Sequence, residues 1–131
     1  MTPGRQAWLS LFSWDFVTAQ NKALCAAKAA HHGRTSDGHD RTRELWEERH
    51  REAMSLEEAV DLCRRCHHLA PFCFYNGNTF TAIVRTVISR LDLEEAKGFA
   101  IRSLAGHIVA GVATDEEKQA FKQFSDSLLN P

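Results

Sequence analysis

The feature that most constrains the fold is a helical spacing of apolar residues, which recurs along the chain without the alternation that marks strands. From Trp8 to Ala27, aromatic and alanine side chains recur at three- and four-residue steps, which predicts one long amphipathic helix that ends by Gly33. Residues 34–38 are rich in turn formers and predict an exposed loop. A polar helix follows, and its inner side carries the apolar residues Leu45, Trp46, Ala53 and Met54.

Capping signals predict where the later helices begin. Each pairs a residue that can accept from the first turn with a glutamate three positions on: Ser55 with Glu58, Asp92 with Glu95, and Thr114 with Glu117. Pro71 ends or bends the third helix, and a further helix runs from near Thr79 to Leu91. Because the polar face of that helix is weak, we expect it to be central. The sequence therefore predicts an all-α bundle of about six helices, in a single domain over residues 1–131.

Composition excludes several classes of protein. The 131 residues include 16 Lys and Arg against 17 Asp and Glu, a formal net charge of −1, with 44% apolar and 25% charged residues. These values are those of a globular chain, and they argue against a disordered protein and a specific nucleic-acid binder. No apolar stretch is long enough to span a bilayer, so no membrane partner is expected.

The N-terminal stretch has some features of a signal peptide, since Arg5 precedes an apolar run over residues 7–12. Asp15 and Lys22 interrupt it before any clean cleavage site, so we interpret the stretch as helix. The four cysteines fall at helical spacing in a chain long enough to build its own core. We therefore expect a cytoplasmic protein with reduced thiols.

One loop suggests chemistry. Gly77 and Asn78 come just before the predicted central helix, where free backbone N–H groups and the positive end of the helix dipole favour a phosphate or carboxylate. The same residues also suit an ordinary turn with an N-cap. Both interpretations stay open on this pattern alone.

The segment around this loop resembles a known family. Residues 74–83 read Phe-Tyr-Asn-Gly-Asn-Thr-Phe-Thr-Ala-Ile, which is similar to the Fic/Doc (Fido) signature His-x-Phe-x-(Asp/Glu)-(Gly/Ala)-Asn-(Gly/Lys)-Arg. The order of predicted helices and the segment over residues 110–117 are also similar to the small Doc-type toxins. The resemblance implies a Fido-like fold and transfer of a nucleoside monophosphate or phosphate from a nucleotide to a protein hydroxyl. It implies ATP or another nucleotide with Mg²⁺ as cofactor, and a protein target or an antitoxin as partner.

The residues that carry scaffold roles in the family match this chain. Phe74 corresponds to the buried motif phenylalanine that anchors the loop in the core. Gly77 and Asn78 correspond to the small residue and the asparagine of the phosphate-binding turn, and Thr79 follows them. The resemblance thus implies that Gly77, Asn78 and Thr79 bind phosphate, although Thr79 stands where the family has glycine or lysine. Arg85, further along the helix, is a candidate phosphate ligand by its position.

The residues that carry the chemistry do not match. Phe72 stands at the position of the catalytic histidine, Asn76 at that of the acidic metal ligand, and Phe80 at that of the phosphate-binding arginine. Phenylalanine can neither take up a proton nor bind a phosphate, and a neutral amide brings no charge to Mg²⁺. His68, one helical turn before Phe72, is a candidate replacement base, as Arg85 is for the arginine. The resemblance therefore implies that the chain is a degenerate member of the family, a pseudoenzyme. Any remaining activity would be that of a nucleotidyl- or phosphotransferase.

Other patterns suggest metal or haem. Cys63-Arg64-Arg65-Cys66-His67 matches the haem-attachment pattern, and His68 and Cys73 extend the same residues towards a zinc site. No second paired cysteine motif accompanies them, and Cys63 and Cys66 fall on the apolar face of a predicted helix, which favours core thiols.

The alternative function is a helical protein-interaction or structural module, a homodimer through aromatic helix faces, with no nucleotide site. The two functions predict different surroundings for the loop before the central helix. A Fido-like protein leaves it in an open groove, whereas a plain bundle buries it.

Overall fold

A computed structural model describes residues 4–129 of the protein, and within that range it has six α-helices and no β-strand. The prediction of an all-α bundle of about six helices is confirmed. The helices are α1 (Trp14–Ala27), α2 (His39–Arg49), α3 (Leu56–Leu69), α4 (Asn76–Ser89), α5 (Glu95–Ala110) and α6 (Asp115–Leu129). None of the helices in this range is both long and apolar enough to cross a membrane.

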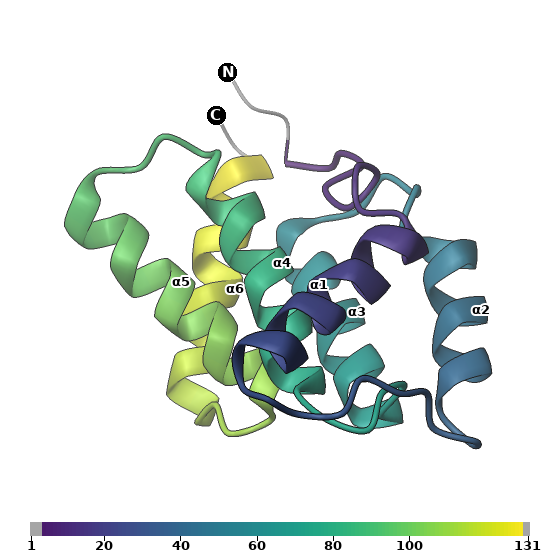
Figure 1. Cartoon of the computed structure of the whole chain (residues 1–131). Coiled ribbons are helices and arrows are strands. Elements are labelled where there is room, and N and C mark those ends of the chain that lie inside the picture. Colours follow the sequence, from purple (N-terminus) through teal and green to yellow (C-terminus); the bar gives the residue numbers. More distant parts are fainter. Residues whose placement is uncertain (1–3, 130–131) are drawn as a thin grey trace.

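Helix α4 lies at the centre of the bundle and packs against α1, α3 and α5 (Figure 1). It buries a set of apolar side chains because its sequence is apolar on most of its circumference: Phe80, Ile83, Val84, Val87 and Ile88. The prediction of a central helix is confirmed. Helices α5 and α6 lie together on one side of α4, and α2 lies on the opposite side of the molecule (Figure 1).

The first helix is shorter than predicted at both ends. It begins at Trp14, where the Ser13 hydroxyl accepts from the N–H of Phe16, and it ends at Ala27. The residues before it form a non-helical segment, and the side chains of Leu9 and Phe12 in that segment are buried. Their spacing in the sequence is the same as that of apolar residues on one face of a helix. The second helix also ends early, at Arg49, so Ala53 and Met54 follow α2 rather than lying on it.

Two of the three capping predictions are confirmed. Ser55 and Glu58 form a reciprocal capping box at the start of α3, and Thr114 and Glu117 do the same before α6. The third is wrong by two residues. Asp92 adopts a left-handed conformation with φ of 55°, and the Glu94 carboxylate caps α5 instead by accepting from the N–H groups of its first turn.

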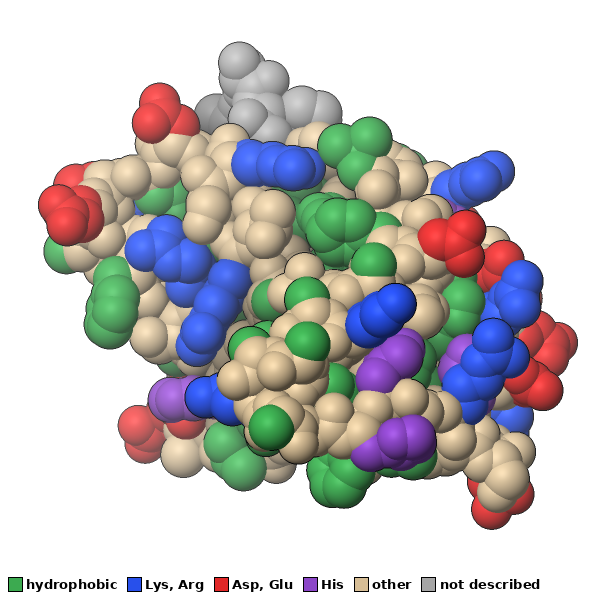
Figure 2. Space-filling model, viewed as in Figure 1, with side chains coloured by type: hydrophobic (Ala, Val, Ile, Leu, Met, Phe, Trp, Pro, Cys, Tyr) green, Lys and Arg blue, Asp and Glu red, His purple; other side chains and the backbone are tan. Residues whose placement is uncertain are grey.

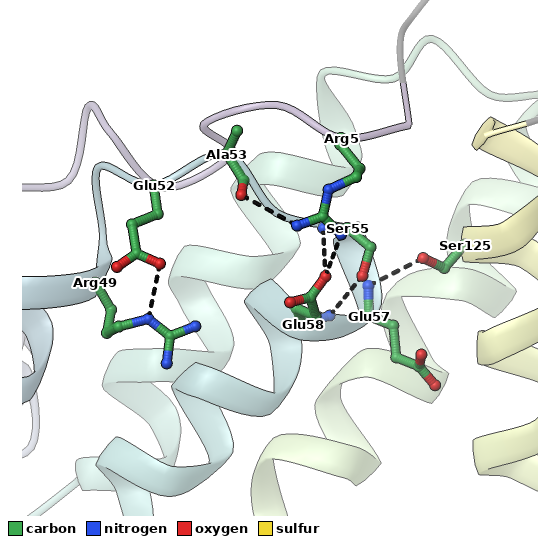
Figure 3. Close-up of polar contacts among 8 residues, drawn as sticks. All are labelled: Arg5, Arg49, Glu52, Ala53, Ser55, Glu57, Glu58 and Ser125. Carbon is green, nitrogen blue, oxygen red and sulfur yellow. Dashed lines mark hydrogen bonds and ion pairs between the residues drawn. The ribbon is translucent and has the colours of Figure 1, made fainter.

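Polar contacts at the start of α3 tie distant segments together (Figure 3). The guanidinium of Arg5 donates to the carboxylate of Glu58 over 2.7 Å, which joins the N-terminal segment to the capping box. The backbone N–H of Glu57 donates to the hydroxyl of Ser125 over 3.0 Å, which joins α3 to α6. Glu58 therefore serves both its own helix cap and the docking of the N-terminal segment. The hydrogen bond from the backbone N–H of Ser55, and then that from Arg5, lower the pKa of its carboxyl.

Candidate functional site

The central helix begins three residues earlier than predicted, at Asn76. Tyr75 precedes it in a left-handed conformation with φ of 61°, so Asn76, Gly77 and Asn78 form the first turn of α4 rather than a turn before it. The Asn76 side chain accepts from the backbone N–H of Phe72 and donates to the carbonyl of the same residue, over 2.9 and 2.7 Å. This residue therefore closes the loop before α4, and a negatively charged aspartate there could make only the first of the two bonds.

The first turn of α4 opens into a groove of about 640 Å³ between α3, α4 and α5. Of the predicted phosphate-binding residues, the structure brings Gly77, Asn78 and Arg85 together in this groove. The N–H groups of a helix's first turn have no acceptor within the helix, so those of Asn76, Gly77 and Asn78 are free to bind an anion. The lining side chains within the described part of the chain include no carboxylate: His67, Cys73, Phe74, Tyr75, Asn76, Gly77, Asn78, Thr81, Arg85, Gly106, His107 and Ala110.

Thr79, also predicted to bind phosphate, does not line the groove. It is fully buried, its hydroxyl donates to the carbonyl of Tyr75, and the Asn21 amide donates to that hydroxyl over 3.1 Å. The earlier start of α4 explains the difference, because it moves Thr79 to the position where regular helical hydrogen bonding begins.

The predicted motif anchor is also wrong. Phe74 is 50% exposed at the groove, whereas Phe72 is only 1% exposed. The Phe72 ring stacks on Trp14 with centroids 5.8 Å apart and meets the edge of His39. The loop is therefore anchored by Phe72, which the resemblance aligns with a catalytic histidine, and the Phe72 side chain does not line the groove.

Phe80, which the resemblance aligns with the phosphate-binding arginine, does not line the groove either. It is fully buried, and its ring lies 5.8 Å from that of Trp46. The two positions at which the resemblance expects catalysis and phosphate binding therefore both lie in the hydrophobic core.

The groove contains one histidine that the sequence suggested only as a metal ligand. His67 of α3 donates from Nδ1 to the carbonyl of Val109 over 2.7 Å, and that bond leaves Nε2 as the second polar atom of the ring. A Cβ at Gly77 would lie 3.1 Å from His67 Cε1, so the missing side chain of Gly77 makes room for the imidazole. Only packing of α3 against α4 brings these residues together, and no spacing in the sequence reveals it.

His68, the candidate replacement base, lies elsewhere. Its Nδ1 donates to the carbonyl of Arg64, and its ring lies close to Gly111 in a separate hollow beside α6. Neighbouring residues of a helix point about 100° apart, and here His67 takes the groove side. His68 is therefore not placed to act on a ligand at the start of α4.

The cysteine pattern does not form a site. Cys63 and Cys66 are buried in the core, where burial raises the pKa of the Cys66 thiol to about 12 and that of Cys63 well above its usual value. Covalent haem attachment and metal binding both require accessible thiolates. Within residues 4–129, no three His, Cys, Asp or Glu side chains gather in an arrangement that could hold a metal ion.

A buried amide supports the loop from behind. The Asn21 side chain, fully buried on α1, donates to the carbonyl of Phe74 over 2.8 Å as well as to Thr79. Its oxygen accepts from Nδ1 of His32 over 2.9 Å. One residue thus connects α1, α4, the loop before α4 and the segment after α1, and it holds the backbone of Phe74, a residue that lines the groove.

This network predicts a pH dependence of stability. Burial, with smaller contributions from Lys22 and other nearby cations, lowers the pKa of His32 below its ordinary value of 6.5. The unfolded chain therefore binds a proton more readily, so the stability that His32 contributes is full above about pH 6.5 and is lost as the pH falls below that value. Urea unfolding between pH 7.5 and pH 5 should show this loss, and His32→Gln should reduce its slope. An equal slope in the variant would assign the dependence to other groups.

Comparison with known proteins gives no match at any level. No family model matches the chain, and the searches of curated proteins and of solved structures found no match either.

Proposed function

We propose that this chain is a degenerate Fic/Doc-like protein, whose groove binds the phosphates of a nucleotide but no longer transfers them. The observation that carries the proposal is the open groove at the first turn of α4, where Arg85 adds a cation and no described lining residue adds a carboxylate. The guanidinium of an arginine and the N–H groups of a helix start are both donors suited to phosphate oxygens. A groove of about 640 Å³ also lies within the range of small-molecule sites.

The loss of transfer follows from the placement of the core. Phe72 and Phe80 hold the positions of the catalytic histidine and the arginine, and both are buried. The side-chain amide of Asn76 is hydrogen-bonded to the backbone of Phe72 and carries no charge. This turn therefore provides no charged ligand for Mg²⁺. A Mg²⁺ ion would accompany the nucleotide rather than be held by the protein. The main role of the protein in the cell would be to bind another protein, regulated by the nucleotide.

Calorimetric titration with ATP, GTP and pyrophosphate, each with and without Mg²⁺, tests the proposal. Gly77→Glu places a negative charge in the first turn of α4, where the helix tolerates acidic residues, but any side chain there also makes the His67 imidazole shift by a few tenths of an ångström. Gly77→Gln makes the same shift without the charge, so binding should be lost in Gly77→Glu and largely kept in Gly77→Gln. Arg85→Ala removes an exposed donor and should weaken binding about tenfold, the equivalent of roughly 1.4 kcal/mol. Arg41→Ala on α2 is the matched control, since Arg41 is also exposed and lies outside the groove.

Two results would contradict the proposal. Absence of binding at millimolar nucleotide would favour the alternative helical interaction module. Binding that Gly77→Glu and Arg41→Ala affect equally would place the anion elsewhere on the surface. A sedimentation measurement on the same samples tests whether the protein is a homodimer, as that alternative expects.

A further inference from the structure

One buried hydrogen-bond donor has no acceptor. The indole Nε1 of Trp8 is screened from solvent, and among the described residues it is the one buried side-chain nitrogen or oxygen without a hydrogen-bond partner. Buried polar atoms are almost always hydrogen-bonded, and a donor left unpaired costs free energy. The buried indole of Trp46, by contrast, donates to the carbonyl of Phe12 over 2.8 Å. The indole of Trp8 therefore points to an acceptor that the described residues do not supply.

Trp8 lies in a segment that the bundle holds in place. The backbone of Gln6 exchanges two hydrogen bonds with that of Met54, over 3.1 and 3.0 Å, and the N–H of Trp8 donates to the carbonyl of Gln6. Leu9, the next residue, is fully buried, and the Trp8 ring itself packs against the core. The indole therefore has a defined place on the bundle.

Trp8 lines a hollow of about 460 Å³ between the N-terminal segment and the end of α4, a volume within the range of small-molecule sites. Apolar side chains enter it from both sides, Leu11 from the segment and Val87 and Leu91 from α4 and its end. Its described lining residues include one cation, Arg90, and no carboxylate. On the face shown in Figure 2, hydrophobic side chains gather where the N-terminal segment passes the start of α1, and the acidic ones lie toward the edges.

The guanidinium of Arg90 is held next to this segment by an aromatic ring. Its Cζ lies 5.6 Å from the centre of the Phe12 ring, within the range of a cation–π contact. Other arginines, such as Arg41 and Arg65, also have no ion pair within residues 4–129, but among the described arginines only Arg90 shares a hollow with an unpaired buried donor. Arg90 and Leu11 are both exposed, so their side chains can move to admit a ligand beside the indole.

We propose that this hollow binds a small carboxylate that carries a short apolar chain. An indole N–H can only donate, so its partner must be an acceptor, and the guanidinium of Arg90 favours an acceptor with a negative charge. The apolar chain would lie against Leu11, Val87 and Leu91. A nucleotide, with several negative charges, suits this hollow poorly because the hollow offers a single cation.

The inference goes beyond nucleotide binding and does not rest on it. Gly77 and Val87 are ten residues apart on α4, which corresponds to about 15 Å along its axis, and the groove at the start of the helix shares no lining residue with this hollow.

An NMR titration of isotope-labelled full-length protein with hexanoate tests the proposal, because each indole N–H gives its own signal. We expect the signal of the Trp8 indole to move downfield as its N–H gains an acceptor. The signal of the Trp46 indole should stay in place, since that N–H already has one. A dissociation constant of about 1 mM or lower is expected for a ligand of this size.

Two variants each remove one of the groups that hold the carboxylate. Trp8→Phe keeps an aromatic ring, deletes the donor and identifies its signal, and Arg90→Gln deletes the charge. Each should weaken hexanoate binding at least about fivefold. Arg41→Gln on α2 is the matched control, because Arg41 is exposed and lies outside the hollow, and it should bind hexanoate as the wild type does. Hexanamide, which keeps an acceptor without the charge, should bind at least about threefold more weakly than hexanoate.

Three results would overturn the proposal: a Trp8 indole signal that does not move at about 10 mM hexanoate, equal affinities for hexanoate and hexanamide, or equal affinities of the Arg90→Gln and Arg41→Gln variants. The Arg90→Gln comparison also decides the question if Trp8→Phe does not fold. Arg90→Gln should leave nucleotide binding unchanged, so failure of this site and failure of the nucleotide site give different results.

Discussion

Phe80→Arg, which would restore the arginine of the family signature, is expected to unfold the protein. The side chain of Phe80 is fully buried against Trp46 and the neighbouring core. The substitution removes a buried ring, which costs about 3–5 kcal/mol, and leaves a buried charge without a partner, which costs several more. The sum is comparable to the whole stability of a domain, about 5–15 kcal/mol. Circular dichroism during urea titration measures the loss.

Phe80→Leu is the matched control, because it keeps an apolar side chain and should cost only about 1–2 kcal/mol. A folded Phe80→Arg protein with an unchanged unfolding midpoint would contradict the structure. It would mean that the arginine reaches the groove, and that this position could still serve phosphate binding.

The prediction of six helices succeeded where apolar residues repeat over several turns. Helix α4 was predicted as central because its apolar residues cover most of its circumference, and its core residues are those that the pattern selects. The predicted start of α1 is wrong because that prediction relied on the same periodicity of apolar residues. Leu9 and Phe12 are buried at helical spacing, but from an irregular segment, and the periodicity of burial alone cannot distinguish the two.

The candidate site was predicted in part. Gly77, Asn78 and Arg85 lie on one helix, so their proximity to one groove follows from local geometry. The prediction for Thr79 is wrong because the role of this residue depends on where the helix begins. The helix begins three residues earlier than predicted, and the side chain of Thr79 is buried in the core. His67 was missed as a groove residue because α3 must first pack against α4 and α5 to bring it there.

The anchor of the loop shows where sequence likeness misleads. Phe72 and Phe74 are two residues apart in a segment without regular structure, so no periodicity tells which one is buried. The resemblance predicts that Phe74 is buried, but it is Phe72 that is buried, because its ring packs against Trp14 and His39. Both aromatic partners come from other parts of the chain, so the motif alone does not determine how its own residues pack.

Phe72→Ala and Phe74→Ala therefore make a matched pair with opposite expectations. Phe72→Ala should lower the free energy of unfolding by about 3–5 kcal/mol, because it opens a cavity beside the stacked ring of Trp14. Phe74→Ala should cost less than about 1 kcal/mol, since half of its side chain is already in solvent. Urea unfolding monitored by tryptophan fluorescence measures both.

A third variant extends this pair to the question of catalysis. Phe72→His restores the family's histidine, but at a buried position beside Trp14 and His39. It should be less stable than the wild type, increasingly so below about pH 6.5, because a buried imidazole resists protonation that the unfolded chain accepts. It should also transfer nothing from ATP to protein. Equal losses for the two alanine variants, or transferase activity in Phe72→His, would show that residue 72 faces the groove and that the chemistry is one substitution away.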